Sequence, residues 1–294
     1  MTCPSHVNRH LCRRVGSRAL PLVAAVLMLA MPVAHAADWP GEGPLRGSFE
    51  PPAAAGGGLR WDGVNFGATL GLSSMNADFG SGTSNQIAYI LRNTTIENEG
   101  GVSRWTTLPN TSTNSRQYGG FIGYNWQMEE LVLGADITYN RFTSLEASAN
   151  DTMSRIFDTS DGYTNTVTVS SSSSLRLVDY ATLRGRAGYA MGQFLPYAMV
   201  GMAVGRFNYS STATVTASGT NNGAPPTTYG PSTGTNSDGK NNAFQIGFLG
   251  GVGIDVALLQ NVFLRAEYEY IMFSPVNGVR TNLSTGRVGV GVRF

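Results

Sequence analysis

The sequence predicts an all-β fold: an eight-stranded antiparallel up-and-down transmembrane β-barrel with long extracellular loops. Three observations predict it. Segments in which apolar residues alternate with small or polar residues recur from Trp61 to Phe294. Long polar loops and very short turns separate these segments alternately. The chain also begins with a segment typical of exported proteins.

Residues 1–36 indicate a cleavable secretory signal peptide. Four arginines, Arg9, Arg13, Arg14 and Arg18, precede an apolar stretch over residues 20–31, and Ala34-His35-Ala36 offers small residues around a cleavage site. The apolar stretch is shorter than the roughly 20 residues that a membrane-spanning helix needs. We therefore expect a signal peptide over 1–36, a Pro/Gly-rich periplasmic tail over 37–60 and the barrel over 61–294.

Removing the signal peptide leaves a chain without cysteine or histidine, because Cys3, Cys12, His6, His10 and His35 all lie within it. Disulfides, thiolate chemistry and histidine-based metal sites are then excluded, and so is a Ser/His/Asp triad. Of the 20 basic residues 16 remain, against 19 acidic ones, which gives a net charge of −3. We expect a protein that is not an enzyme, carries no cofactor and binds no nucleic acid.

The strand segments follow one another in a regular order. In the first, Val64, Phe66 and Leu70 alternate with glycine, asparagine and threonine, so the two sets lie on opposite faces of a strand. The eight segments cover about residues 61–73, 117–127, 131–140, 179–190, 198–205, 244–256, 262–270 and 287–294. Short turns at 128–130, 191–193 and 257–260 alternate with long loops at 76–116, 145–178, 209–242 and the shorter 274–282. This asymmetry is typical of outer-membrane barrels with the long loops outside the cell.

One face of the strands is apolar and the other carries charge. The charged positions are Asp136, Arg184, Arg186, Asp255, Arg265, Glu267, Glu269, Arg287 and Arg293. A soluble barrel such as a lipocalin would place its apolar face inward, and these charges cannot form an apolar core. We therefore expect the apolar face to contact lipid and the charges to form a paired network that fills a narrow lumen.

Aromatic residues on the apolar face gather at the two ends of the strands, which predicts two interfacial girdles. The girdle residues are Tyr118, Trp126, Tyr139, Tyr189, Phe244 and Tyr270. The terminal Phe294 completes the last strand, and we expect it to act as the assembly signal.

Several motifs together resemble a known family. They are Trp61-Asp62-Gly63, the stretch Gly119 to Trp126 (GGFIGYNW), Leu183 to Tyr189 (LRGRAGY), Leu195-Pro196-Tyr197 and the terminal stretch Gly289 to Phe294 (GVGVRF). Their order and spacing resemble the "porin family" of outer-membrane β-barrels, which includes alphaproteobacterial major surface antigens and hemin-binding outer-membrane proteins. The resemblance covers about residues 61–294. It implies a location in the outer membrane of a Gram-negative bacterium, and a C-terminal strand read by the barrel-assembly machinery.

Four functions remain to be ordered. A structural and surface-interaction role, in membrane integrity or as a surface antigen, requires the least, since the barrel anchors loops that face an extracellular ligand. A narrow porin-like channel is the alternative, because eight strands leave an interior that side chains largely fill. Hemin binding, suggested by relatives, would need a tyrosine or methionine ligand such as loop residues Tyr163, Tyr209 or Tyr229. An enzyme comes last. The remaining partner is outer-membrane lipid.

Overall fold

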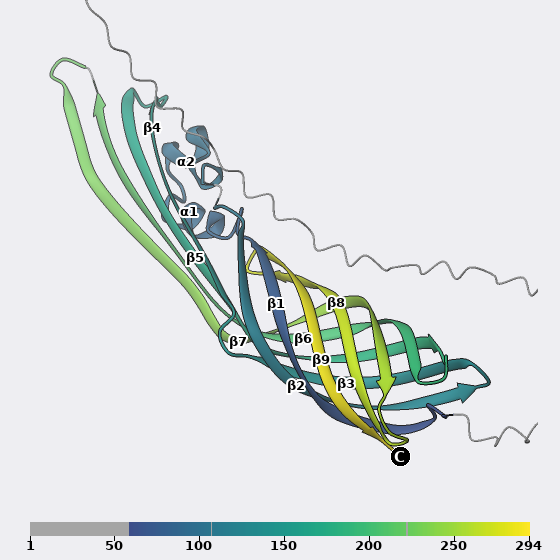
Figure 1. The fold of residues 1–294 in the computed structure, drawn as a ribbon. Helices are drawn as coiled ribbons and strands as arrows, with labels where there is room; N and C mark the ends of the chain where they lie inside the picture. The colour runs from purple at the N-terminus through teal and green to yellow at the C-terminus, as the bar shows by residue number, and fades with distance from the viewer. Residues whose placement is uncertain (1–58, 107, 222) are drawn as a thin grey trace, which may run out of the picture. The chain divides into compact units, whose positions relative to one another are not determined.

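The computed structural model describes residues 59–106, 108–221 and 223–294 (Figure 1). The predicted signal peptide and nearly all of the predicted periplasmic tail lie outside the described residues. The described part contains nine β-strands and three short helices. The strands are β1 (Gly63–Asp78), β2 (Thr111–Met128), β3 (Leu131–Phe142), β4 (Glu146–Asp158), β5 (Tyr163–Tyr189), β6 (Phe194–Asn221), β7 (Thr227–Ala257), β8 (Val262–Val276) and β9 (Val279–Arg293). The helices are α1 (Ser84–Ile90), α2 (Thr95–Gly100) and the 3₁₀ helix η1 (Val102–Arg104).

Eight of the nine strands close into a barrel, which confirms the predicted fold. The sheet runs β3-β2-β1-β9-β8-β7-β6-β5-β4, and a further antiparallel pairing of β3 with β5 closes the ring and leaves β4 outside it. The first and last strands pair over a long register, from Asn65 opposite Arg293 to Asp78 opposite Arg280. Closure satisfies the backbone polar groups of the strands with one another, which a lipid environment requires.

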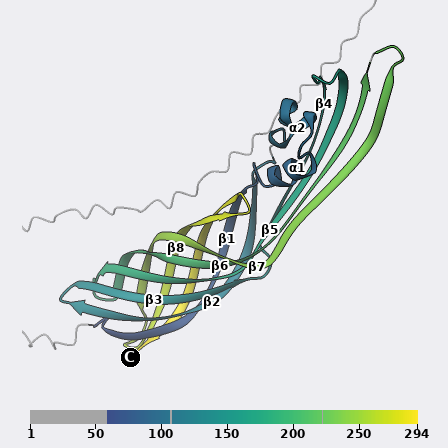
Figure 2. The ribbon, with the colours of Figure 1, turned by 180° about the vertical axis from the view of Figure 1, so that it is seen from behind.

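The three longest predicted loops are largely ordered structure, which the alternation pattern did not predict. The segment 145–178 forms β4 and the outer half of β5, and 209–242 forms the outer halves of β6 and β7. These strands of 27, 28 and 31 residues far exceed the roughly 9–11 that cross a membrane. They continue side by side beyond the barrel, and we call the part of the sheet over 146–176, 209–221 and 227–240 the extension (Figures 1 and 2).

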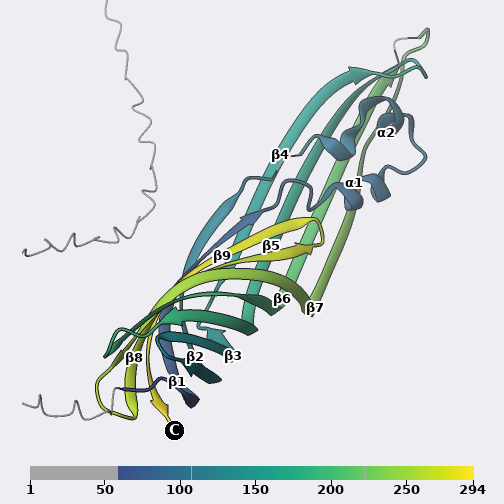
Figure 3. The same ribbon diagram turned by 90° about the vertical axis from the view of Figure 1, so that its right-hand side faces the viewer.

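The first predicted loop contains all three helices, which lie along the extension (Figure 3). Among the described residues, no helix is long and apolar enough to cross a membrane. The prediction of a loop over 274–282 is wrong, because β8 and β9 continue through most of this range to a two-residue turn. Asn277 and Gly278 adopt φ angles of 46° and 79° there, which is the left-handed geometry that an Asn-Gly hairpin favours.

The apolar parity of the strands reverses where they leave the barrel wall. In β1 the exposed apolar residues are even-numbered, ending with Leu70 and Leu72, whereas Met75 and Ala77 are odd-numbered and buried. In β8 and β9, Ile271 and Leu283 likewise face inward. Lipid surrounds the part of each strand in the barrel wall, and water surrounds the part beyond it. The apolar residues therefore change from the outward to the inward face along the strand.

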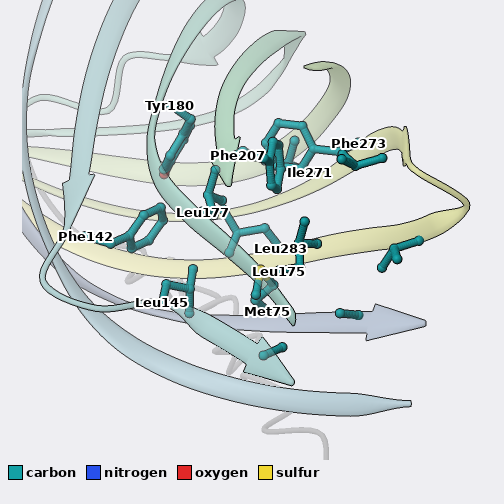
Figure 4. Close-up of a cluster of buried hydrophobic side chains, with 14 of the residues drawn as sticks. Met75, Phe142, Leu145, Leu175, Leu177, Tyr180, Phe207, Ile271, Phe273 and Leu283 are labelled. Carbon is teal, nitrogen blue, oxygen red and sulfur yellow. The ribbon is translucent and has the colours of Figure 1, made fainter. Parts of the chain in front are cut away.

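The inward residues above the reversal form a core at the outer end of the barrel, which we call the upper core (Figure 4). It joins side chains from seven of the barrel strands, from β4 and from the loop that follows η1. Its members include Met75, Leu108, Phe142, Leu145, Leu175, Leu177, Tyr180, Phe207, Ile271, Phe273 and Leu283. Burial of so much apolar surface at about 25 cal/mol per Å² makes this end of the barrel a packed structure that the membrane does not need to support.

Candidate functional site

The lumen contains a network of buried charges, built from strands far apart in the chain. It comprises Asp136 of β3, Arg184 and Arg186 of β5, Asp255 of β7, Arg265, Glu267 and Glu269 of β8, and Arg287 of β9. Each is 6% exposed or less. Each projects inward because it alternates with a lipid-facing neighbour on its strand. Four arginines face four carboxylates, so this lumen network is formally neutral.

The outer half of the network centres on two arginines. Arg287 donates from Nε to Glu267 at 2.6 Å and from Nη2 to Glu269 at 2.8 Å. Arg184 donates to Asp136 at 2.6 Å and to Glu267 at 3.1 Å. Each guanidinium therefore joins carboxylates from two or more positions, which fixes the relative positions of β3, β5, β8 and β9.

The inner half centres on Asp255. Arg265 binds it through Nε at 2.9 Å and Nη2 at 2.8 Å, and Arg186 binds it at 3.3 Å. Tyr197 links the halves, because its hydroxyl donates to Glu267 at 2.7 Å and lies 3.2 Å from Asp255. The net contribution of an intact buried ion pair to stability is small, because the cost of desolvating both charges offsets their attraction. Removing one partner, however, leaves an uncompensated charge that costs about 3–5 kcal/mol.

Arg293 does not join this network, although the sequence places it on the same face. Its Nη2 donates to the Gln260 carbonyl oxygen at 2.6 Å, and its guanidinium lies 4.8 Å from the centre of the Trp61 ring. Both partners lie at the end of the barrel that carries the short turns. The pattern of alternation predicts the facing of a side chain but not its depth among its neighbours, so it could not separate Arg293 from the others.

Apolar layers lie on both sides of the lumen network. The upper core covers its outer side. On its inner side a second cluster, the lower core, contains Trp61, Phe121, Val132, Leu195, Met199 and Phe263, with Tyr197 at its border. Arg265 lies against it, 4.0 Å from the centre of the Phe121 ring. Sequence reasoning missed these inward aromatic residues because it assigned aromatics to the lipid face. The signal was available, since Phe121 and Phe263 fall on the charged face by parity.

The predicted girdle residues are all exposed on the outer wall. Trp126 and Tyr189 lie at the ends of β2 and β5 next to the short turns, and Tyr118, Tyr139, Phe244 and Tyr270 lie toward the extension. Tyr139 also donates a 3.0 Å hydrogen bond to Asp179 at the outer edge of the apolar band. Phe294 is exposed and stacks on Phe66 with ring centres 5.8 Å apart. The structure thus positions each of these side chains at the barrel surface.

The extension has a core of its own, which joins it to the helices. Ile87 and Leu91 at α1, Val102 of η1 and Trp105 pack on the inner face of β5 and β6, where the buried residues are Val167, Val169, Ala213, Val215 and Ala217. Trp105 donates from its indole nitrogen to the Gly100 carbonyl at 2.8 Å and packs edge-on against Phe157. Gln86 donates to Ser211 at 2.8 Å. The first predicted loop is therefore a folded cover for the extension.

The other face of the extension consists of hydroxyl groups in rows. Thr152, Ser170, Thr214 and Thr235 lie in one register row across β4, β5, β6 and β7, and two of their side-chain pairs are bonded at 3.1 and 3.0 Å. A parallel row two residues along contains Ser154, Thr168, Thr216 and Thr233, with bonds of 2.9 and 3.1 Å. We call these two rows the hydroxyl face; their eight side chains carry no charge and are half-buried or exposed.

The turn between β4 and β5 is held by an acidic side chain. Asp161 accepts hydrogen bonds from Thr159 at 2.5 Å and from Thr95 at 3.0 Å. The bond from Thr159, and then the bond from Thr95, hold the pKa of this exposed carboxyl below its usual value, against an opposing contribution from partial desolvation. The bond to Thr95 fixes the start of α2 to the tip of the hairpin.

A metal ion and hemin are the two kinds of ligand that the residue types of the sequence bear on. Over the described ranges no group of three or more His, Cys, Asp and Glu side chains could hold a metal ion. The loop tyrosines proposed for hemin have other contacts. Tyr229 bonds Asn165 through its hydroxyl, Tyr163 lies 3.3 Å from the Thr227 hydroxyl and Tyr209 packs beside the upper core.

Comparison with known proteins gives three results. The model of the family described as "Outer membrane protein beta-barrel domain" matches residues 22–294. The chain is 25% identical over 187 residues to the "22 kDa outer membrane protein" of Rhizobium leguminosarum bv. viciae, a match that covers 60% of this chain and 66% of that relative.

Matches among solved structures include Ail, the attachment invasion locus protein of Yersinia pestis, at 12% identity and a TM-score of 0.31, covering 79% of this chain and 99% of that one. Neisserial surface protein A matches at 15% identity and a TM-score of 0.32, covering 78% and 97%. OprG of Pseudomonas aeruginosa matches at 10% and 0.35, covering 79% and 97%.

Proposed function

Given that the chain belongs to the outer membrane protein β-barrel domain family and is a β-barrel protein of the bacterial outer membrane, we propose that it is a non-enzymatic surface protein. Its barrel serves as an anchor, and its extension presents a rigid surface outside the cell for structural or adhesive contacts. The observation that carries the proposal is the extension, which has its own apolar core and an exposed hydroxyl face.

The rigidity of the extension supports a role in binding other molecules or surfaces. A loop that only connects strands would not need a buried tryptophan, a capped helix or a hydrogen bond from α2 to the β4–β5 turn. Here Thr94 caps α2 by accepting from the Glu97 backbone N–H at 3.2 Å, and Trp105 is almost fully buried. A preformed surface loses less conformational entropy on binding than a disordered loop does.

The filled lumen supports an anchor over a channel. A water-filled path would have to cross the upper core, the lumen network and the lower core in turn. Each consists of large side chains in contact, among them Phe207 and Phe273 at 5.1 Å and Phe121 and Phe263 at 6.1 Å between ring centres. Eight-stranded barrels have interiors just wide enough for side chains to fill.

The absence of catalytic chemistry is part of the proposal. The mature chain has no His or Cys if cleavage follows residue 36. The inward carboxylates that could serve as a general acid and base, Glu267 and Glu269, are each bound by two arginines and a tyrosine. Both carboxylates are therefore occupied by fixed donors of the barrel itself and are not placed to contact a substrate.

Two partners follow from the same picture. Outer-membrane lipid surrounds the apolar band. We further propose that the barrel-assembly machinery recognises the last strand through Phe294, whose ring is exposed on the outer wall.

Planar-bilayer recording tests the anchor against the channel. The refolded protein, checked by a heat-modifiable gel shift, should give no reproducible conductance steps. Steps that change when Arg184 is replaced by Gln would instead establish a pore through the lumen network.

Cell adhesion tests the role of the extension. Cells that display the full chain are compared with cells that display a variant in which 147–175 and 211–238 are each replaced by a two-residue turn. The deletion ends lie opposite one another, at Glu146 and Arg176 and at Ser210 and Gly239, so the barrel register is kept. Adhesion to protein- or carbohydrate-coated surfaces should fall to the level of cells without the protein. Equal adhesion by both strains, at equal surface amounts of folded barrel, would refute the proposal.

A further inference from the structure

A groove of about 790 Å³ lies on the outer wall of the barrel, where β8, β9, β1, β2 and β3 face lipid. One register row crosses it: Leu264, Val290, Ala68, Gly120 and Tyr139 are successive partners on these five strands. The row has bulky residues at its ends and two small ones in the middle. The groove exists because Ala68 and Gly120 have almost no side chain.

The next row toward the extension forms the wall above the hollow. It contains Ala266, Val288, Leu70, Tyr118 and Arg141. Leu70, Tyr118 and Val288 also line the groove. The lining is almost entirely apolar, so the groove suits a hydrocarbon chain lying against the barrel wall.

A second, smaller hollow of about 350 Å³ lies two residues farther along β1 and β2. Polar residues contribute to its lining, but most of the lining surface is carbon. Leu72 separates it from the groove, and Asn114, Ser115, Arg116, Thr143 and Ser144 line it. Two residues along a strand correspond to about 7 Å. Arg116 is therefore one step above Tyr118, and Arg141, the register partner of Tyr118, lies beside it.

Both arginines are exposed, and neither forms an ion pair among the described residues. The carboxylate in register with Arg141 is Asp179, and its oxygens already bind Arg206 and the Tyr139 hydroxyl. Two cations without an acidic partner thus lie at the upper edge of the apolar band, which is the depth of the headgroups of the outer leaflet.

We propose that this two-part site binds a phosphorylated lipid of the outer leaflet. One acyl chain occupies the groove over Ala68 and Gly120. The phosphate lies between Arg116 and Arg141, and the amide and hydroxyl groups of Asn114, Thr143 and Ser144 bond hydroxyl groups of the headgroup. Arginine favours this contact because its planar guanidinium binds phosphate through two parallel N–H groups.

The combination of the two parts favours a lipid over other occupants. Inorganic phosphate could bind the arginines but would leave the groove empty. A second copy of the chain would have to place carboxylates opposite Arg116 and Arg141. On this face Asp179 is already bound by Arg206, and the exposed Asp78 lies farther along β1, in register with Arg280. A lipid with an anionic headgroup satisfies the apolar and the cationic parts at once.

Native mass spectrometry of the full refolded chain in detergent tests the site. The probes are diphosphorylated lipid A, phosphatidylethanolamine and inorganic phosphate, each at the same molar excess. We expect lipid A to be retained at one copy per chain, and at least tenfold more of it than of phosphatidylethanolamine.

Two variants separate the parts of the site. R116Q together with R141Q should reduce retention of lipid A about tenfold, because the phosphate contacts are lost. Gly120→Leu should reduce it as well by filling the groove. An added Cβ at Gly120 lies 3.2 Å from its nearest neighbour, the Gly67 carbonyl, so the barrel can still form.

Matched controls lie elsewhere on the same wall. Gly250 is also an outward glycine, and a Cβ added there meets nothing within 4 Å, so Gly250→Leu should retain lipid A as the unaltered chain does. R280Q removes an exposed arginine of β9 that lies outside both hollows and should also have no effect. All variants are first shown to fold by heat-modifiable mobility.

Three results would overturn the proposal: retention of lipid A by the arginine double variant at the level of the unaltered chain, retention of phosphatidylethanolamine equal to that of lipid A, or binding of inorganic phosphate that the lipid does not displace. A dimer that forms without lipid and is lost in the Gly120→Leu variant would assign the groove to a second copy and overturn it as well.

Discussion

Replacing Arg287 with Met tests whether the lumen network stabilises the barrel as a unit. Arg287 contributes three bonds of 2.6 to 2.9 Å to Glu267 and Glu269. The substitution leaves three arginines facing four carboxylates in a site shielded from solvent. Loss of one partner from a buried pair costs about 3–5 kcal/mol, because the remaining charge stays desolvated. We expect the free energy of unfolding to fall by that amount.

The double variant Arg287→Met/Glu269→Met distinguishes charge balance from loss of contacts. It restores three cations facing three anions, so its cost should be smaller than the sum of the two single variants. The difference measures their coupling. Arg206→Gln is the control, since it removes an arginine–aspartate pair at the outer edge of the apolar band, where the Arg206 side chain is 31% exposed, and should have a smaller effect.

The assay is urea unfolding of the protein refolded into phospholipid vesicles, followed by tryptophan fluorescence and by heat-modifiable mobility. A shift of the midpoint at constant slope reports a change in stability. If Arg287→Met lost less than about 1 kcal/mol, or if the double variant lost as much as the sum of the singles, the network would not act as a balanced unit and the reasoning from a buried uncompensated charge would fail.

Three further outcomes are expected. Val290→Arg places a charge on the lipid face and should lower the stability of the folded barrel by about 2–4 kcal/mol if Val290 lies near the midplane, measured by the same unfolding assay; unchanged stability would contradict the assigned facing. Trp105→Ala should cost about 3–5 kcal/mol of local stability, seen as faster proteolysis within 84–106 while the barrel keeps its heat-modifiable shift. The folded-state pKa of Asp161 is lowered, so the stability of its turn should be complete above the unfolded value of about 3.9 and be lost as pH falls through the lower folded value. Hydrogen exchange at 159–163 measures this loss, and Thr159→Ala should shift it upward in pH; the same profile in both proteins would show that the hydrogen bond is not the cause.

Much of the barrel could be predicted from the sequence because lipid imposes a strict rule. Every second residue of a membrane-spanning strand must be apolar, so residues such as Leu183 and Val290 identify their own facing. The charged residues between them are then inward, and their pairing follows from the cost of leaving a charge alone in a narrow lumen. Eight of the nine charges singled out in this way lie in one network.

The extension could not be predicted by the same rule. One face of its strands is in water and the other carries only a narrow apolar stripe. In the sequence, Val167 and Val169 are flanked and separated by threonine and serine. Such segments resemble polar loops in composition. Their partners, Ile87 and Trp105, come from a distant segment, so the need for burial becomes visible only when the two segments are brought together. The Asn277-Gly278 turn was a local signal that could have extended β8 and β9.

The reversal of apolar parity in the strands has a consequence for how the barrel sits in its membrane. On β7 the outward apolar residues run from Phe244 to Ile254. These ten steps span about 33 Å along the strand, or about 25 Å along the membrane normal at a tilt of about 40°. Above this band the outward positions are polar and the inward ones are apolar. Raising the barrel by two residues along the strand would therefore put Phe244 in water, and lowering it by the same amount would put Arg206 in hydrocarbon. The position of the reversal along the strands therefore sets the height of the extension above the bilayer, and a membrane of another thickness must adjust to the protein.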